Sequence, residues 1–235
     1  MYYLDYSRNN FRGIIPKSLC KARYLEVLNL SNNSLSGTVP HCLTTLSTLS
    51  VLNLRRNNLR NVDMLSHNCS LRTLDMSENQ IQGHFLKSFV NCPQLKVLNL
   101  GKNQITGPFP CFLMNIFTLH VLVLRSNKFY GDIGCLKTNG SWPMLQIIDL
   151  AHNNFSGKVP GRLLTTWQAM MANQDNASTK LNQLQFQDSG GNYYQDTITI
   201  TNKGFEIELV KILTIFTSID ISCNKFNGSI PEEIG

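Results

Sequence analysis

The residues best suited to chemistry in this 235-residue chain are charged side chains that recur between regularly spaced aliphatic residues. Where aliphatic and polar residues alternate, the polar ones lie on the open face of a strand. The set that we predict to contact a ligand on that face comprises Arg55, Arg56, Arg72, Glu78, Lys96, Lys102, His120 and Arg125. Its excess of positive charge suits an acidic peptide, protein or polysaccharide, because opposite charge aids encounter. The competing interpretation is a solvated strand face without a ligand, since polar residues are the default there.

No arrangement of residues typical of catalysis accompanies this charge. The five histidines are scattered, and neither H-E-x-x-H nor G-x-S-x-G occurs. The seven cysteines form no C-x-x-C and no cluster with zinc-finger spacing. The net charge of +6 is dispersed, which disfavours nucleic acid as a partner. The sequence therefore predicts a recognition protein that is not an enzyme and uses no cofactor and no metal.

The elements that must position the charged residues repeat about every 24 residues. Each copy has an asparagine five residues after an aliphatic one, in a motif of the form L-x-L-x-x-N, at Asn9, Asn33, Asn57, Asn79, Asn103, Asn127, Asn153 and Asn224. The alternating leucines predict a short strand, and the asparagine can bond main-chain groups that the turn leaves unpaired. This motif at this period predicts a leucine-rich-repeat solenoid. We expect a curved right-handed superhelix, with a parallel β-sheet on the concave face and short 3-10 or irregular segments on the convex face.

The interval between Asn153 and Asn224 is much longer than one repeat. We therefore expect an insertion, which we call the island, at 161–206, between repeats at 1–160 and a resumed repeat at 207–235. Loops of this length are usually functional or disordered.

The island contains two signals. Alternation over Thr197–Leu209, on both sides of Asn-Lys-Gly, predicts a β-hairpin. Tyr193, Tyr194 and Lys203 form a second candidate surface for a ligand, because aromatic residues often dominate interface energy. The tyrosines could equally pack the hairpin onto the solenoid.

Sequons and cysteines together favour an extracellular location. Candidate glycosylation sites, each followed by x-Ser, are Asn32, Asn68, Asn139, Asn154, Asn176 and Asn227. Repeats rich in Asn and Ser also produce such triplets by accident. A further sequon, at Asn29, lies on the strand face, where a glycan is least expected.

The cysteines allow more than one pairing. Cys111 and Cys135 occupy equivalent places in adjacent repeats, within disulfide range. Cys92 with Cys111 is a competing pair, and Cys20 with Cys42 is plausible on similar grounds. Buried free thiols are the alternative. The odd number of cysteines leaves one thiol free or paired elsewhere.

The consensus L-x-x-L-x-L-S-x-N-x-L-S-G-x-I-P resembles plant extracellular leucine-rich repeats. Tyr193-Tyr194-Gln-Asp, Lys203-Gly204 and Thr217-Ser-Ile-Asp-Ile-Ser-Cys-Asn-Lys-Phe-Asn-Gly-Ser-Ile-Pro look like the island and the next repeat of plant receptor-like proteins. Within these, the chain is most similar to the Verticillium wilt resistance type. The likeness covers essentially the whole chain.

The resemblance implies the ectodomain of a cell-surface immune receptor that lacks a kinase domain. Such proteins signal through an adaptor receptor-like kinase and a somatic-embryogenesis-type co-receptor kinase, in response to an extracellular peptide, protein or oligosaccharide. With no signal peptide and no long apolar run, we expect a fragment of a plasma-membrane protein. The alternatives are the ectodomain of a receptor kinase, a secreted inhibitor of pathogen wall-degrading enzymes, and an inactive truncated product.

Overall fold

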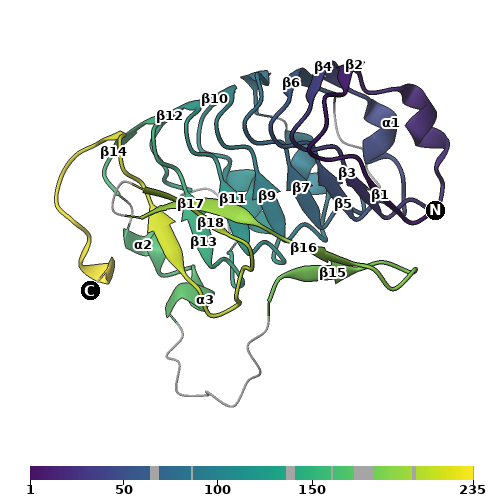
Figure 1. Ribbon diagram of the computed structural model, residues 1–235. Coiled ribbons are helices and arrows are strands. Elements are labelled where there is room, and N and C mark those ends of the chain that lie inside the picture. Colours follow the sequence, from purple (N-terminus) through teal and green to yellow (C-terminus); the bar gives the residue numbers. More distant parts are fainter. Residues whose placement is uncertain are drawn as a thin grey trace.

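The computed structural model describes residues 1–63, 69–85, 87–135, 141–159, 161–171, 183–202 and 205–234. Short parallel strands stack side by side into one eight-stranded sheet on the concave face of a curved solenoid (Figure 1). In order they are β1 (Tyr3–Asp5), β3 (Val27–Asn29), β5 (Val51–Asn53), β7 (Thr73–Asp75), β9 (Val97–Asn99), β11 (Val121–Val123), β13 (Ile147–Asp149) and β19 (Ser218–Asp220). The predicted leucine-rich-repeat solenoid is confirmed.

The concave sheet stays in register because each repeat places the same positions side by side. Leu28 pairs with Leu52, Leu52 with Leu74, and Leu74 with Leu98. These leucines are at most 1% exposed, so every repeat completes the core of its neighbour rather than a core of its own.

A second parallel ladder runs along the next side of the solenoid, which the sequence did not predict (Figure 1). Its strands are β2 (Arg12–Ile14), β4 (Ser34–Val39), β6 (Asn58–Val62), then β8 (Gln82–His84), β10 (Gln104–Gly107), β12 (Lys128–Gly131), β14 (Asn154–Gly157) and β20 (Lys225–Phe226). The ladder is interrupted between β6 and β8. Gly37, Gly83 and Gly107 have positive φ in this ladder, whereas Asn61 stands at the corresponding place in β6.

Short helices complete most turns of the solenoid. They are η1 (Lys17–Lys21), α1 (His41–Thr44), η2 (Lys87–Asn91), η3 (Cys111–Asn115), α2 (Gly161–Leu164), α3 (Gln168–Met171) and η4 (Glu232–Ile234). Pro16, Pro40 and Pro110 each stand immediately before one of them, where the missing N–H costs nothing. Among the residues that the structure describes, no helix is both long and apolar enough to cross a membrane.

The repeated asparagines bind neighbouring turns together. Asn103 Nδ2 donates to the carbonyl oxygens of Met76, Leu100 and Gly101 at 3.0, 3.1 and 3.2 Å. Its Oδ1 accepts from the N–H of Ile81 at 3.0 Å. Equivalent bonds recur at Asn57 and Asn153. One side chain thus satisfies main-chain groups of two repeats, which explains its recurrence.

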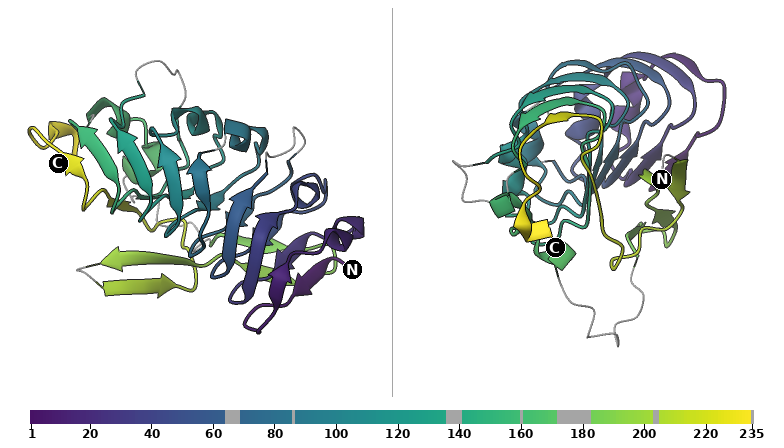
Figure 2. Two further views of the ribbon diagram at one scale, coloured as in Figure 1. Left: turned by 90° about the horizontal axis from the view of Figure 1, so that it is seen from above. Right: turned by 90° about the vertical axis from the view of Figure 1, so that its left-hand side faces the viewer.

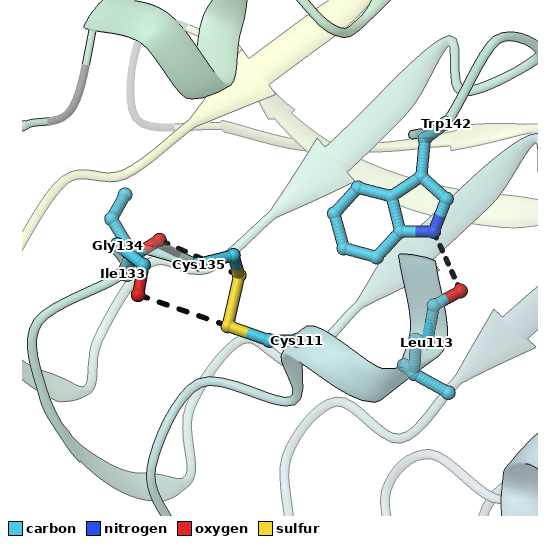
Figure 3. Close-up of a disulfide and its surroundings, with 6 residues drawn as sticks. All are labelled: Cys111, Leu113, Ile133, Gly134, Cys135 and Trp142. Carbon is cyan, nitrogen blue, oxygen red and sulfur yellow. Dashed lines mark hydrogen bonds between the residues drawn. A yellow bond between two sulfur atoms is a disulfide. The ribbon is translucent and has the colours of Figure 1, made fainter. Parts of the chain in front are cut away.

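Disulfides join adjacent turns on the helix-bearing side. The pairs are Cys20–Cys42, Cys69–Cys92 and Cys111–Cys135, the last shown in Figure 3 beside Trp142, whose Nε1 donates to Leu113 O at 2.8 Å. The competing pairing of Cys92 with Cys111 is wrong, because Cys92 reaches back one turn to Cys69. Among the described residues Cys223 is free and exposed.

The island forms two hairpins that lie across the concave face (Figures 1 and 2). The first pairs β15 (Gln185–Gln187) with β16 (Tyr193–Gln195). The second pairs β17 (Ile198–Asn202) with β18 (Phe205–Leu209), antiparallel, where the alternation predicts a hairpin. β18 extends three residues beyond 206, the expected end of the island.

Candidate ligand-binding surface

The concave sheet carries an apolar row at positions that alternation assigns to solvent. Val27, Val51, Thr73, Val97, Val121 and Ile147 stand side by side in consecutive strands. All six are at most 2% exposed. Sequence reasoning missed this row, although aliphatic residues at outward-facing strand positions are a readable signal.

Basic residues stand on both sides of the apolar row. Arg72, Lys96 and His120 precede Thr73, Val97 and Val121 in their strands. Arg55 and Arg125 stand four residues after Val51 and Val121. The sheet therefore forms a groove with an apolar floor and charged sides.

The island fills this groove with every second side chain of one extended segment. Tyr194, Asp196, Ile198 and Ile200 are 7%, 1%, 0% and 8% exposed, while Gln195, Thr197 and Thr199 between them are half-buried. We call residues 194–200 the strap. Its period-two burial is that of a strand with one face on a surface.

Tyr194 anchors the strap at β3 and β5. Its ring shares a buried cluster with Val27 and Val51, and its hydroxyl accepts a hydrogen bond from Asn53 Nδ2 at 2.9 Å. Burial, reinforced by Asp196 and Asp75, raises the pKa of Tyr194. The tyrosine therefore stays neutral and packs the island onto the solenoid, as one of the two interpretations of the sequence proposed.

Asp196 supplies a buried carboxylate in the middle of the strap. Thr73 Oγ1 donates to its Oδ1 at 2.7 Å, and Arg72 Nη2 lies 3.5 Å from its Oδ2. The guanidinium of Arg72 also lies over the ring of Phe186, 5.5 Å from the centroid. Burial raises the pKa of Asp196, and Arg72 opposes that rise.

Desolvation lowers the pKa of two other basic residues on this side of the groove. Burial lowers the pKa of Lys96, and neighbouring Arg72 lowers it further. Burial also lowers the pKa of His120, which is 8% exposed and stands near Lys96 and Arg72. His120 Nδ1 lies 2.7 Å from Thr118 O, and since a carbonyl only accepts, Nδ1 carries the proton.

The far side of the groove holds β18 through ion pairs. Arg55 Nη1 lies 3.0 Å from Glu208 Oε1, and Arg55 Nη2 donates to Thr199 Oγ1 at 3.0 Å. Lys102 Nζ lies 2.6 Å from Glu206 Oε1. The space left between hairpin and sheet here is only ≈ 20 Å³, so the docked hairpin leaves no room for a ligand beneath it.

Glu78 and Arg125 form further ion pairs along the sheet. Glu78 pairs with Arg55 at 2.8 Å and with Arg56 at 2.7 Å. Although burial opposes it, hydrogen bonds from Arg56 and Arg55 lower the pKa of Glu78. Arg125 binds Asp149 at 3.2 Å and Asp220 at 2.9 Å, which links three neighbouring strands.

The structure thus divides the predicted ligand-contacting residues into covered and open ones. Arg55, Arg72 and His120 are at most 9% exposed, beneath or beside the island. The side chain of Arg56 is 51% exposed and that of Lys102 is 36% exposed. An open, charged concave face is therefore the wrong picture for the first three, because Arg55 and Arg72 pair with the island and His120 is buried near Lys96 and Arg72.

The other predicted sites differ in their exposure. Tyr193 is exposed at 60%, and Lys203 lies outside the described residues. Asn154 and Asn227 are exposed, and Asn32 is half-buried with φ of 54°. Asn68, Asn139 and Asn176 lie outside the described residues. Within the described part of the chain, no group of three or more His, Cys, Asp and Glu is arranged to hold a metal ion.

Comparisons with known proteins agree with this geometry. A family model described as Leucine rich repeat matches residues 1–59 and 23–81, and a second Leucine Rich Repeat model matches 94–116, 144–165 and 216–235. Over 100% of its length the chain is 42% identical to Receptor-like protein 35 and 44% identical to Receptor-like protein 32, both of Arabidopsis thaliana. It spans only 24% and 26% of these two relatives.

Solved structures show the same architecture. The crystal structure of PEPR1 with AtPEP1 is 26% identical and superposes with a TM-score of 0.73, over 100% of this chain and 26% of that one. The ectodomain of the Arabidopsis thaliana receptor kinase GASSHO1/SCHENGEN3, in complex with CASPARIAN STRIP INTEGRITY FACTOR 2, is 30% identical with a TM-score of 0.65, over 72% of this chain and 20% of that one. Because the two repeat models together match more than half of the residues, and the sheet is the repeating parallel one, this chain belongs to the leucine-rich-repeat family.

Proposed function

We propose that this chain is the ligand-recognition segment of a plant cell-surface receptor-like protein that acts in immunity. Whole-length similarity to receptor-like proteins, island included, carries the proposal. The groove supports it physically, because its apolar floor and charged sides suit an extended partner. The ligand is a pathogen- or wall-derived molecule bound on the concave face, the island or both.

The place of action that we propose is the extracellular side of the plasma membrane. Three disulfides between adjacent repeats favour an oxidising compartment. The exposed sequons at Asn154 and Asn227 are open to glycosylation. An adaptor receptor-like kinase and a somatic-embryogenesis-type co-receptor kinase would carry the signal, as the family resemblance implies.

A specific observation favours one alternative, the ectodomain of a receptor kinase. GASSHO1/SCHENGEN3 is a membrane receptor kinase and is 30% identical over 72% of this chain, so the segment also suits the ectodomain of a receptor kinase. The two functions share the recognition surface and differ in whether a kinase domain lies beyond the repeats. The finer resemblance to the Verticillium wilt resistance type stays a prediction.

The test of recognition changes Arg56 and Lys102, the two exposed cations at the edge of the groove, which we call the open flank. The secreted chain is immobilised, and peptide fractions of extracellular fluid from infected and uninfected leaves are titrated by interferometry. We expect saturable binding from infected leaves, weakened at least tenfold by Arg56→Glu with Lys102→Glu, because both cations are exposed beside residues that bind the island.

A matched variant makes the same change in charge elsewhere. Arg12→Glu with Lys128→Glu alters two exposed residues of the second ladder and should leave binding unchanged. Equal loss in both variants would place recognition in net charge rather than in this surface. The proposed function would be contradicted if no peptide fraction from infected leaves bound the chain saturably.

A further inference from the structure

The strap crosses the concave strands in the way that an extended peptide would. From Tyr194 to Ile200 an extended chain advances about 20 Å, at 3.3 Å per residue. Four strand spacings, from β5 to β13, measure about 19 Å. The segment runs across these strands in Figure 1, so its length matches the part of the groove that it occupies.

Each inward side chain of the strap meets a chemically matched place in the groove. The aromatic ring of Tyr194 lies with Val27 and Val51. Asp196 meets the cation of Arg72 and the hydroxyl of Thr73.

Two aliphatic residues complete the match. Ile198 and Ile200 share one buried cluster with Val97, Val121, Val123 and Ile147. The groove is therefore complementary to a segment with the pattern aromatic-x-Asp-x-Ile-x-Ile.

The chain returns to this groove from far along its sequence. The bond between Asn53 and Tyr194 spans 141 residues, and that between Thr73 and Asp196 spans 123. Within the described ranges no repeat strand pairs with the strap, so side chains hold it in the groove. A segment that the repeats hold by side chains is replaceable by another chain that presents the same groups.

We propose that the strap is an internal occupant of the ligand groove, and that the groove takes an extended peptide with an aromatic, an aspartate and two aliphatic residues at alternate positions. This rests on the proposed recognition function and specifies its ligand. Such a peptide enters by displacing the strap. When the strap binds with an intrinsic Kd of about 10 µM and is tethered at an effective concentration of about 1 mM, it weakens the binding of a peptide roughly 100-fold. The strap therefore sets a threshold for binding.

The test supplies the strap in trans. A fluorescent peptide of sequence YYQDTITIT, residues 193–201, is titrated by anisotropy into the full 235-residue chain and into its Tyr194→Ala, Ile198→Asp variant. Both substitutions weaken the internal copy and leave the groove intact. Intact disulfides and an unchanged near-ultraviolet spectrum of the core tryptophans verify the fold. We expect binding to the variant to be at least 30-fold tighter than to the unaltered chain.

Two controls fix the register and the charge. A peptide with the residues of positions 196 and 198 exchanged, YYQITDTIT, has the same composition but presents isoleucine to Arg72 and aspartate to the apolar floor, and should not bind. Adding Arg72→Asp to the variant should abolish binding of the original peptide, and a peptide with arginine at the place of Asp196 should restore it.

Several outcomes would overturn the inference. They are equal affinity for both forms of the chain, equal binding of the exchanged peptide, and no binding to a variant whose fold is intact. Because the peptide comes from the chain itself, none of these results depends on a natural ligand or a kinase. If the strap proves not to be displaced, the proposed recognition of a ligand at the open flank still stands.

Discussion

At the scale of single residues, the repeated asparagine is the feature that the sequence predicts best. Its period is regular, and its role follows from side-chain chemistry, so the bonds of Asn103 were predictable in kind. The partners of Arg55 and Arg72 were not, because Glu208 and Asp196 stand 153 and 124 residues away along the chain. Alternation shows which face a side chain takes, and it carries no information on what covers that face.

Replacing Asn103 with Ala should lower the free energy of unfolding by about 2–3 kcal/mol, because the buried carbonyls and the N–H of Ile81 lose their partner. Urea unfolding followed by circular dichroism measures the change. Asn9, whose side-chain amide donates to Tyr6 O and Ser7 O within its own exposed turn, provides the control, and Asn9→Ala should cost less than about 1 kcal/mol. Equal costs would show that the interrepeat bonds contribute nothing.

His120 predicts a dependence on pH. Burial lowers its pKa below the ordinary value of 6.5, so the unfolded chain binds more protons than the folded one between these two pKa values. Stability therefore rises with pH up to about 6.5 and falls on acidification. Lys96, Arg72 and the carbonyl of Thr118 face the ring. His120→Gln should flatten the slope of the urea midpoint between pH 5 and 7, whereas His84→Gln, at an exposed site, should not.

At the scale of elements, alternation marks the antiparallel pair β17–β18 but not where it docks. Docking depends on the apolar row, which is spread over six repeats and forms only once they stack. The Cys69–Cys92 pair was missed for a similar reason, since Cys69 follows repeat three, which departs from the consensus at Asn61. Where a repeat departs from the consensus, the sequence does not show which of its residues lie beside those of the next repeat.

Ile200→Asp should release the second hairpin without unfolding the solenoid, because it places a charge on the apolar floor of the groove. Hydrogen exchange should accelerate at least tenfold in β17 and β18 and stay unchanged in β9 and β11. Phe205→Asp, on the same hairpin but 75% exposed, is the matched control. If both substitutions accelerate exchange alike, burial of Ile200 does not hold the hairpin.

At the scale of the whole molecule, each disulfide joins residues 22 to 24 positions apart, about one repeat. Cys69→Ser with Cys92→Ser should lower the free energy of unfolding by about 3 kcal/mol, chiefly by freeing the unfolded chain. Cys223→Ser should not change it, because this thiol is exposed and unpaired. Alkylation of the native chain should label Cys223 alone, and labelling of Cys69 or Cys92 would contradict the pairing.

The return of the island to the first repeats has a mechanical consequence. Solenoids bend easily, because each repeat touches only its neighbours and small rotations add along the stack. Here Ser189 of the island hydrogen-bonds to Glu26, while Ile198 of the island shares a buried cluster with Ile147. The island therefore spans the arc as a chord and limits changes in its curvature. Release of the island would let the whole solenoid change its curvature. Displacement of the island at one repeat would then alter the spacing of distant repeats.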